Sequence, residues 1–120
     1  MPAPPEDDPA GLTRSLVTAR ERTAAQIDAL ARDLDQIFEA CELVSTDDEH
    51  DPEGATIAYE RAQVTALLTQ AREDLDALDR GLADVQRTGH VRCEGCGEPI
   101  ALERVLALPT ARTCFRCAPR

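Results

Sequence analysis

Four of the five cysteines stand in two Cys-x-x-Cys pairs, Cys93 with Cys96 and Cys114 with Cys117, which seventeen residues separate. Two such pairs are typical of a Zn²⁺ site, where four thiolates form a tetrahedron with Zn–S distances of about 2.3 Å. Gly97 suits the turn after the first pair, because glycine accepts a positive φ. The same thiols would form two disulfides in an oxidising compartment. No apolar, positively flanked leader opens the sequence, so we expect a cytoplasmic protein with one structural Zn²⁺.

Coordination by four thiolates leaves no position open for water, so the predicted zinc is structural and we do not expect an enzyme. A metal module of about 25 residues has little core of its own, and in comparable sites Zn²⁺ supplies about 10–16 kcal/mol of folding free energy. The rest of the chain must therefore position this module.

The charge of the chain is strongly negative and unevenly distributed. Thirteen arginines and no lysines stand against 23 acidic residues, for a net charge of −10 over 120 residues. Residues 1–86 carry a net charge of −13 and residues 87–120 a net charge of +3. Nucleic acid repels so acidic a chain, so we expect no direct sequence-specific binding to it. No apolar run approaches the ~20 residues of a membrane span, and we expect no membrane association.

Two apolar seams that alternate steps of three and four residues predict two coiled-coil helices. The first consists of Ile27, Leu30, Leu34, Ile37, Cys41 and Val44, and it weakens toward the N-terminus, where it meets Thr23, Arg20 and Leu16. The second consists of Ile57, Arg61, Val64, Leu68, Ala71, Leu75, Leu78, Leu82 and Val85. Arg61 is the misfit of the second seam, and we interpret Cys41 as a small buried apolar residue.

The short link at 45–54 predicts that the two helices pack as antiparallel neighbours, with Ile37 opposite Val64. The alternative is two separate helices that dimerise with another copy, but we expect a monomer. The predicted fold is all-α: a long antiparallel helical hairpin followed by a small four-cysteine zinc module. The expected divisions are a disordered tail at 1–11, a coiled-coil hairpin at 12–88 with its tip at 45–54, and a zinc module at 89–120.

The hairpin tip is acidic, and capping explains only part of this. Asp51 followed by Pro52 predicts the start of a helix, with Asp51 as its N-cap. Capping does not account for the other acids, which repel one another at a bend. The cluster indicates either a solvated loop or a probe for a basic or metal-containing pocket. The candidate partner-binding residues are Asp47, Asp48, Glu49 and Asp51.

The cysteine segment resembles the DksA/TraR family of zinc-containing transcription factors. The resemblance rests on Cys-x-x-Cys-Gly at 93–97, on Gly-x-x-Ile at 97–100, and on the closing cysteines, with an intervening run of Arg104, Val105, Ala107 and Pro109. Together with the long hairpin it covers residues 12–117, and the cysteine segment is much the more specific part.

The resemblance implies that the hairpin enters the secondary channel of bacterial RNA polymerase and modulates initiation through its tip. The tip pattern of that family is Asp-x-x-Asp-x-Ala, which Asp48 and Asp51 match, whereas Glu53 replaces the alanine. Members that respond to ppGpp use basic residues near the polymerase contact, and this hairpin has few, so we do not expect that response. We assign a weaker contact with an acidic protein surface to Arg104, Arg112 and Arg116 of the zinc module.

Two other functions fit parts of the sequence. The excess of arginine after residue 86 would suit a zinc ribbon that binds nucleic acid, although the acidic remainder of the chain disfavours this. The tip carboxylates would suit a helper of transcript cleavage by polymerase, in which they hold a second Mg²⁺.

Overall fold

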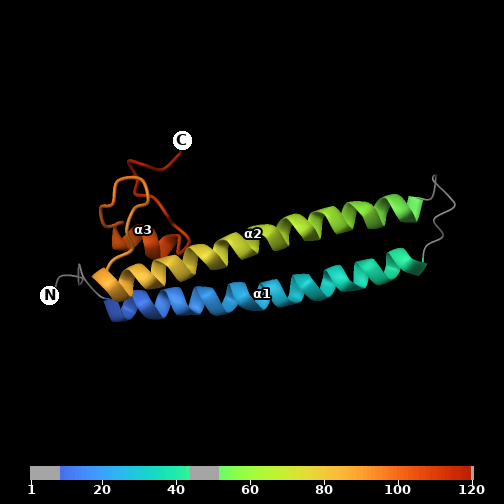
Figure 1. The fold of residues 1–120 in the computed structure, drawn as a ribbon, viewed down its shortest axis with the longest axis horizontal. Coiled ribbons are helices and arrows are strands. Elements are labelled where there is room, and N and C mark those ends of the chain that lie inside the picture. The colour runs from blue at the N-terminus through green and yellow to red at the C-terminus, as the bar shows by residue number, and fades with distance from the viewer. Residues whose placement is uncertain (1–8, 44–51, 120) are drawn as a thin grey trace. The chain divides into compact units, whose positions relative to one another are not determined.

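The computed structural model describes residues 9–43 and 52–119. They form three helices, α1 (Pro9–Leu43), α2 (Pro52–Thr88) and α3 (Leu102–Ala107) (Figure 1). Within these residues the β-structure consists of an isolated antiparallel bridge between Arg92 and Pro99. The predicted all-α hairpin with a C-terminal cysteine module is confirmed. None of the described helices is both long and apolar enough to cross a membrane.

The helix bounds correct two of the expected divisions. Helix α1 begins at Pro9, three residues before the expected start, and Thr13 Oγ1 donates a hydrogen bond of 2.6 Å to the Pro9 carbonyl. Proline suits this first position because the first turn of a helix has no use for its missing N–H. Helix α2 begins at Pro52, as the Asp-Pro sequence predicts, so residues 52–54 belong to this helix and not to the tip. Asp47, Asp48, Glu49 and Asp51 lie outside the described residues.

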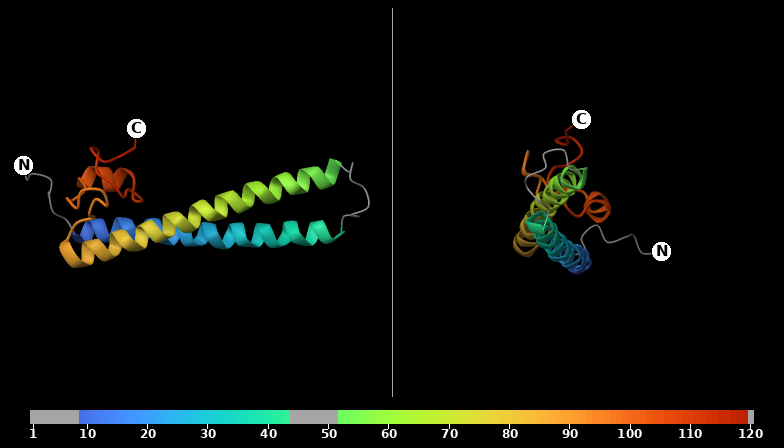
Figure 2. Two further views of the ribbon diagram at one scale, coloured as in Figure 1. Left: turned by 45° about the horizontal axis from the view of Figure 1, so that its top comes forward. Right: turned by 90° about the vertical axis from the view of Figure 1, so that its right-hand side faces the viewer.

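The chain divides into two compact units. The cysteine unit comprises Met1–Thr23 and Asp74–Arg120, and the helix-pair unit comprises Ala24–Glu73. In each unit, segments of α1 and α2 run side by side in opposite directions (Figures 1 and 2).

In the helix-pair unit, the predicted seams are the faces that the two helices turn toward each other. Leu68 and Ala71 are buried, and Arg61, the predicted misfit, is exposed. The other seam residues there are half-buried: Ile27, Leu30, Leu34, Ile37, Cys41, Ile57 and Val64. A pair of helices encloses only the strip between them, so partial burial is what this packing can achieve.

In the cysteine unit, a third layer completes the burial of the two helices. Leu16 and Leu78 are 0% exposed, and they share one core with Val91, Ile100 and Val105 of the C-terminal segment. At Arg20 of α1 the apolar seam is interrupted by a polar residue. Arg20 Nε contacts Asp79 Oδ1 of α2 at 2.5 Å. An ion pair thus replaces an apolar contact where the sequence pattern weakens.

Gly89 ends α2 and turns the chain toward the cysteines. Its φ of 85° is a left-handed conformation that favours glycine, and its N–H donates to the Val85 carbonyl at 2.8 Å. The next residues enter the core at Val91 and reach Cys93, so this turn fixes where the first cysteine pair begins.

Candidate metal centre

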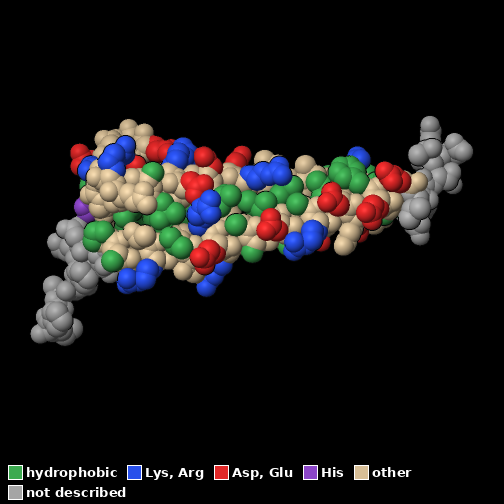
Figure 3. Space-filling view, turned by 60° about the horizontal axis from the view of Figure 1, so that its bottom comes forward, with side chains coloured by type: hydrophobic (Ala, Val, Ile, Leu, Met, Phe, Trp, Pro, Cys, Tyr) green, Lys and Arg blue, Asp and Glu red, His purple; other side chains and the backbone are tan. Residues whose placement is uncertain are grey.

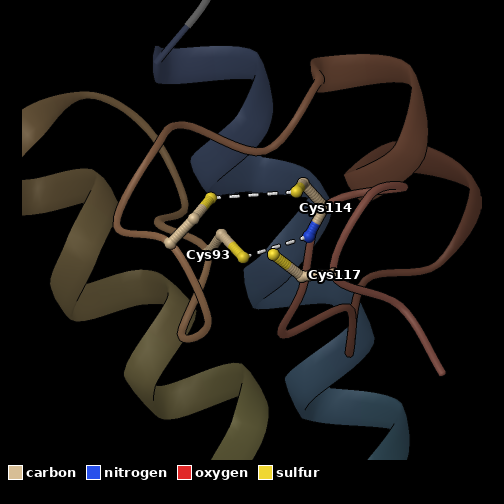
Figure 4. A group of neighbouring side chains, drawn as sticks. Cys93, Cys114 and Cys117 are labelled. Atoms are coloured by element: carbon tan, nitrogen blue, oxygen red, sulfur yellow. Dashed lines mark hydrogen bonds between the residues drawn. The ribbon is translucent and has the colours of Figure 1, made fainter.

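The four paired cysteines converge on one point of the cysteine unit (Figure 4). Their Sγ atoms all lie within 4.8 Å of one another, and Cys96 Sγ lies 3.9 Å from Cys114 Sγ. A tetrahedron with Zn–S distances of about 2.3 Å has edges of about 3.8 Å. The donor set and its spacing therefore fit a single Zn²⁺. Bound there, the ion would cross-link the two pairs and leave no coordination position for water.

The first pair is held in a tight turn by backbone hydrogen bonds. The N–H of Gly97 donates to the Cys93 carbonyl at 2.9 Å, and the N–H of Cys93 donates to the Glu98 carbonyl at 2.8 Å. Gly97 has a φ of 78°, as its position after the pair predicted. The N–H of Gly95 points back to Cys93 Sγ at 3.3 Å.

The second pair closes in a similar way and makes direct contact with the first. The N–H groups of Cys117 and Ala118 donate to the Cys114 carbonyl at 3.1 and 2.9 Å. The N–H of Cys114 donates to Cys93 Sγ at 3.3 Å (Figure 4). Cys93 Sγ thus accepts hydrogen bonds from both turns, which favours its thiolate form.

A role for Gly95 was missed at the level of sequence. A Cβ at this position would lie 3.1 Å from both the Cβ and the Sγ of Cys117. Only glycine lets the two turns come this close without displacing a metal ligand. No signal in the sequence points to Gly95, because the residue that it approaches belongs to the other pair.

The thiols influence one another's ionisation. Hydrogen bonding, chiefly from the Cys114 N–H, lowers the pKa of Cys93 to about 6. The pKa of Cys114 is also lowered, mainly by its backbone hydrogen bond with Cys117. Contacts with the other thiols, Cys114 first, raise the pKa of Cys117 to about 12. Four thiolates at this spacing repel one another, and a divalent cation relieves that repulsion.

Glu94, between the first two cysteines, ties both turns to α2. Its Oε1 accepts a hydrogen bond of 3.0 Å from Arg80 NH1, and it forms an ion pair with Arg112 beside the second pair. Its N–H donates to the Arg112 carbonyl at 2.8 Å. Arg80 also contacts Asp76, one turn earlier on α2, at 2.9 Å. Alternating charges therefore link the helix to the metal centre.

A second link joins the end of α2 to the chain just before the first cysteine. Asp84 Oδ2 accepts a hydrogen bond of 3.1 Å from the Arg92 N–H, and its Oδ1 contacts Arg87 at 2.8 Å. Arg92 NH1 also donates to the Gly97 carbonyl at 3.2 Å. These bonds hold the approach to the first pair against the helix.

The three arginines expected to contact a partner have different surroundings. Arg104 donates from Nε to the Thr113 carbonyl at 2.8 Å and lies 4.7 Å from the centre of the Phe115 ring. Arg112 pairs with Glu94, and burial lowers its pKa. Arg104 and Arg112 are therefore engaged inside the module. Arg116 is exposed, so it is the member of this group most accessible to a partner.

The segment that carries the four cysteines matches a known type of zinc finger. Residues 86–120 match the family model of the prokaryotic dksA/traR C4-type zinc finger. The C-terminal part of the chain is therefore a zinc finger of the DksA/TraR type. The finger type and the clustering of the four thiols confirm the prediction of one structural Zn²⁺.

Two further comparisons give one relative in sequence and one in structure. The uncharacterized protein YteA of Bacillus subtilis (strain 168) is 37% identical over 70 residues, which are 58% of this chain and 29% of YteA. The chain thus matches less than a third of the length of that relative. The structure of transcription factor DksA2 from Pseudomonas aeruginosa has a similar fold, with a TM-score of 0.70 at 24% identity. That similarity covers 90% of this chain and 78% of DksA2.

Proposed function

We propose that this protein is a DksA-like transcription factor that binds bacterial RNA polymerase. The acidic link between α1 and α2 enters the secondary channel of the polymerase and modulates initiation. The observation that carries the proposal is the DksA/TraR-type finger at 86–120, in which Cys93 belongs to the core shared with the paired helices and Cys114 packs against that core. In this role the protein is a binding factor and not an enzyme.

The chemistry of the metal centre supports a binding role. Four thiolates hold the ion closed, so its contribution is mechanical. Val91, Ile100 and Val105 join Leu16 and Leu78 in one core, and the ion stabilises the segment that supplies the first three. The module therefore holds together the ends of α1 and α2 in the cysteine unit.

The charge of the link between α1 and α2 supports its assignment as the part that acts on the polymerase. The link carries Asp47, Asp48, Glu49 and Asp51, and Asp48 and Asp51 stand where the family has its paired aspartates. Asp51 is the predicted N-cap of α2, but capping does not account for the other carboxylates, and such a cluster fits a basic or metal-containing pocket. Arg116 is the exposed arginine that remains for a contact of the module with the polymerase. With few basic residues on the hairpin, we do not expect ppGpp to alter the effect.

The test combines co-purification with in vitro transcription. Tagged wild-type protein is expected to retain RNA polymerase and to change transcript yield from at least some promoters. The double variant Asp48→Ala/Asp51→Ala is expected to retain polymerase and lose the transcriptional effect. Asp28→Ala/Asp35→Ala removes the same charge from exposed positions of α1 and is expected to behave as wild type.

Four results would contradict the proposal or part of it. Failure of the wild-type protein to retain polymerase would remove the binding role. A tip variant that acts as wild type on every promoter would remove the tip mechanism alone. Binding of DNA or RNA without polymerase, falling steeply with salt, would favour the nucleic-acid alternative. Stimulated transcript cleavage in stalled complexes would favour the role as a cleavage helper.

A further inference from the structure

A groove lies between α1 and α2 in the helix-pair unit, with a volume of about 410 Å³. Its apolar lining comes from Ile37 and Ala40 of α1 and from Ile57 and Val64 of α2. Asp33 and Glu60 also line it, one from each helix, and both are exposed. The groove therefore combines an apolar surface with a carboxylate on either helix.

The cysteine unit shows what a covered helix pair looks like. There the seam residues Leu16 and Leu78 are fully buried, because the C-terminal segment packs over the helices. In the helix-pair unit the equivalent seam residues Ile37, Ile57 and Val64 remain half-buried. In the described part of this unit, these three positions therefore leave apolar surface accessible to a partner.

Leu67 extends the apolar surface along α2. It lies three residues after Val64 and seven after Glu60, which places it on the same face of the helix. Its side chain is 47% exposed. Figure 3 shows how hydrophobic side chains stay visible along the paired helices between charged ones. An exposed apolar strip with a charged rim is typical of an interaction surface.

The charge around the groove selects the partner. Residues 24–73 carry twelve acidic residues and three arginines, a net charge of −9. The charged residues that line the groove are both acidic. A partner with basic residues beside an apolar ridge is attracted, whereas a second copy of this chain would bring the same negative charge and be repelled.

We propose that the groove binds a basic amphipathic α-helix of a partner protein. Apolar side chains of that helix pack on Ile37, Ile57, Val64 and Leu67, and its arginines or lysines pair with Asp33 and Glu60. A helix suits the site better than a small molecule, because small-molecule sites enclose most of their ligand, whereas this groove is open to solvent and continues to Leu67. This binding does not depend on the proposed binding of polymerase.

The experiment uses the full chain loaded with zinc and a fluorescein-labelled synthetic helix. The peptide carries leucines at i, i+3, i+4 and i+7 and arginines on both flanks, and its anisotropy reports binding. A peptide with the same leucines and glutamate flanks tests the sign of the charge. Saturable binding of the basic peptide and none of the acidic peptide is expected.

Two variant pairs locate the site. Asp33→Asn/Glu60→Gln is expected to weaken binding roughly three- to tenfold, and Asp35→Asn/Glu73→Gln, which removes equal charge from other faces, less than about twofold. Leu67→Gln is expected to weaken binding roughly fivefold. Leu106→Gln is the matched control, since Leu106 is 48% exposed and lies in the cysteine unit. Circular dichroism checks that each variant is folded.

The outcomes separate the alternatives. Equal weakening by both acidic pairs would mean that the peptide follows net charge alone, and would overturn the proposal. Equal effects of the two leucine variants would overturn it as well. A concentration-dependent dimer in sedimentation that Leu67→Gln dissolves would assign the groove to a second copy, again against the proposal. Loss of polymerase binding in the co-purification assay would leave the peptide result unchanged.

Discussion

Gly95 and Cys117 approach so closely that a methyl group on Gly95 would lie 3.1 Å from the Sγ of Cys117. The two residues belong to different cysteine pairs, so their contact sets how tightly the two turns close around the metal. We therefore expect the affinity for zinc to depend on Gly95, which does not itself bind the ion.

The variant Gly95→Ala tests this relationship. Its methyl group would displace Cys117 by a few tenths of an ångström, and displaced ligands bind metal less well. We expect the dissociation constant for Zn²⁺ to rise by about tenfold, the size of effect seen when the surroundings of ligands are disturbed. Competition with a chromophoric chelator measures it. An unchanged constant would show that the turns separate without cost.

Gly81→Ala is expected to stabilise the fold. A Cβ at Gly81, toward the C-terminal end of α2, would lie 3.7 Å from Val91 and 3.8 Å from Leu16, which are ordinary van der Waals distances. The exchange removes the conformational freedom of a glycine in a helix, so we expect the free energy of unfolding to rise by up to about 1 kcal/mol. Urea denaturation of the zinc-loaded protein measures this change. A loss of stability would mean that the core around Leu16 tolerates no added volume.

Glu94→Gln removes the charge that connects α2 to both cysteine turns. The contact with Arg80 is half-exposed, with side chains 53% and 47% accessible, so solvent screens it. We expect a loss of about 0.5–1 kcal/mol in the free energy of unfolding. The loss should shrink at high salt. Glu103→Gln, at an exposed position of α3, is the matched control, and an equal loss there would exclude a specific role for Glu94.

Zinc uptake is expected to release protons at neutral pH. In the metal-free protein the lowered pKa of Cys93, about 6, makes it a thiolate at pH 7, whereas the raised pKa of Cys117, about 12, keeps it protonated. Because zinc binds thiolates, Cys117 must lose its proton on binding, and affinity should rise with pH between 6 and 9. Calorimetry in buffers of different ionisation enthalpy measures the release. A binding heat that is independent of the buffer would contradict this.

The two thiols also have opposite effects on the stability of the metal-free fold. The lowered pKa of Cys93 stabilises the fold at high pH, and this contribution is lost as the pH falls through about 6. The raised pKa of Cys117 stabilises the fold at lower pH, and this contribution is lost only as the pH rises toward about 12.

Local patterns in the sequence were sufficient for the two long helices and for the turn at Gly97, but they did not predict α3. The spacing of Leu30, Leu34 and Ile37 repeats every helical turn or so, which identifies the buried face of a helix without knowledge of its partner. Gly97 was predictable because its φ depends on the turn that it ends. The start of α2 followed from Pro52, since proline has a preferred place in the first turn.

Features that depend on distant parts of the chain were not predictable. The close approach at Gly95 requires the second cysteine pair, and the engagement of Arg104 requires Thr113 and Phe115. The start of α1 at Pro9 was missed, because the sequence there is proline-rich and lacks an apolar period. The groove at Ile37 and Val64 depends on how two helices pack, which a one-dimensional pattern does not contain.

The shared core of the cysteine unit sets the order in which the protein can be completed during synthesis. Leu16 packs in one cluster with Val105, about ninety residues later in the chain. At roughly 5–20 residues per second, a ribosome needs on the order of 5–20 s to make the second residue after the first. For that time the core around Leu16 lacks the part that the C-terminal segment supplies. The cell must therefore either shield this helix or tolerate its exposure until the last cysteine is made and metal can bind.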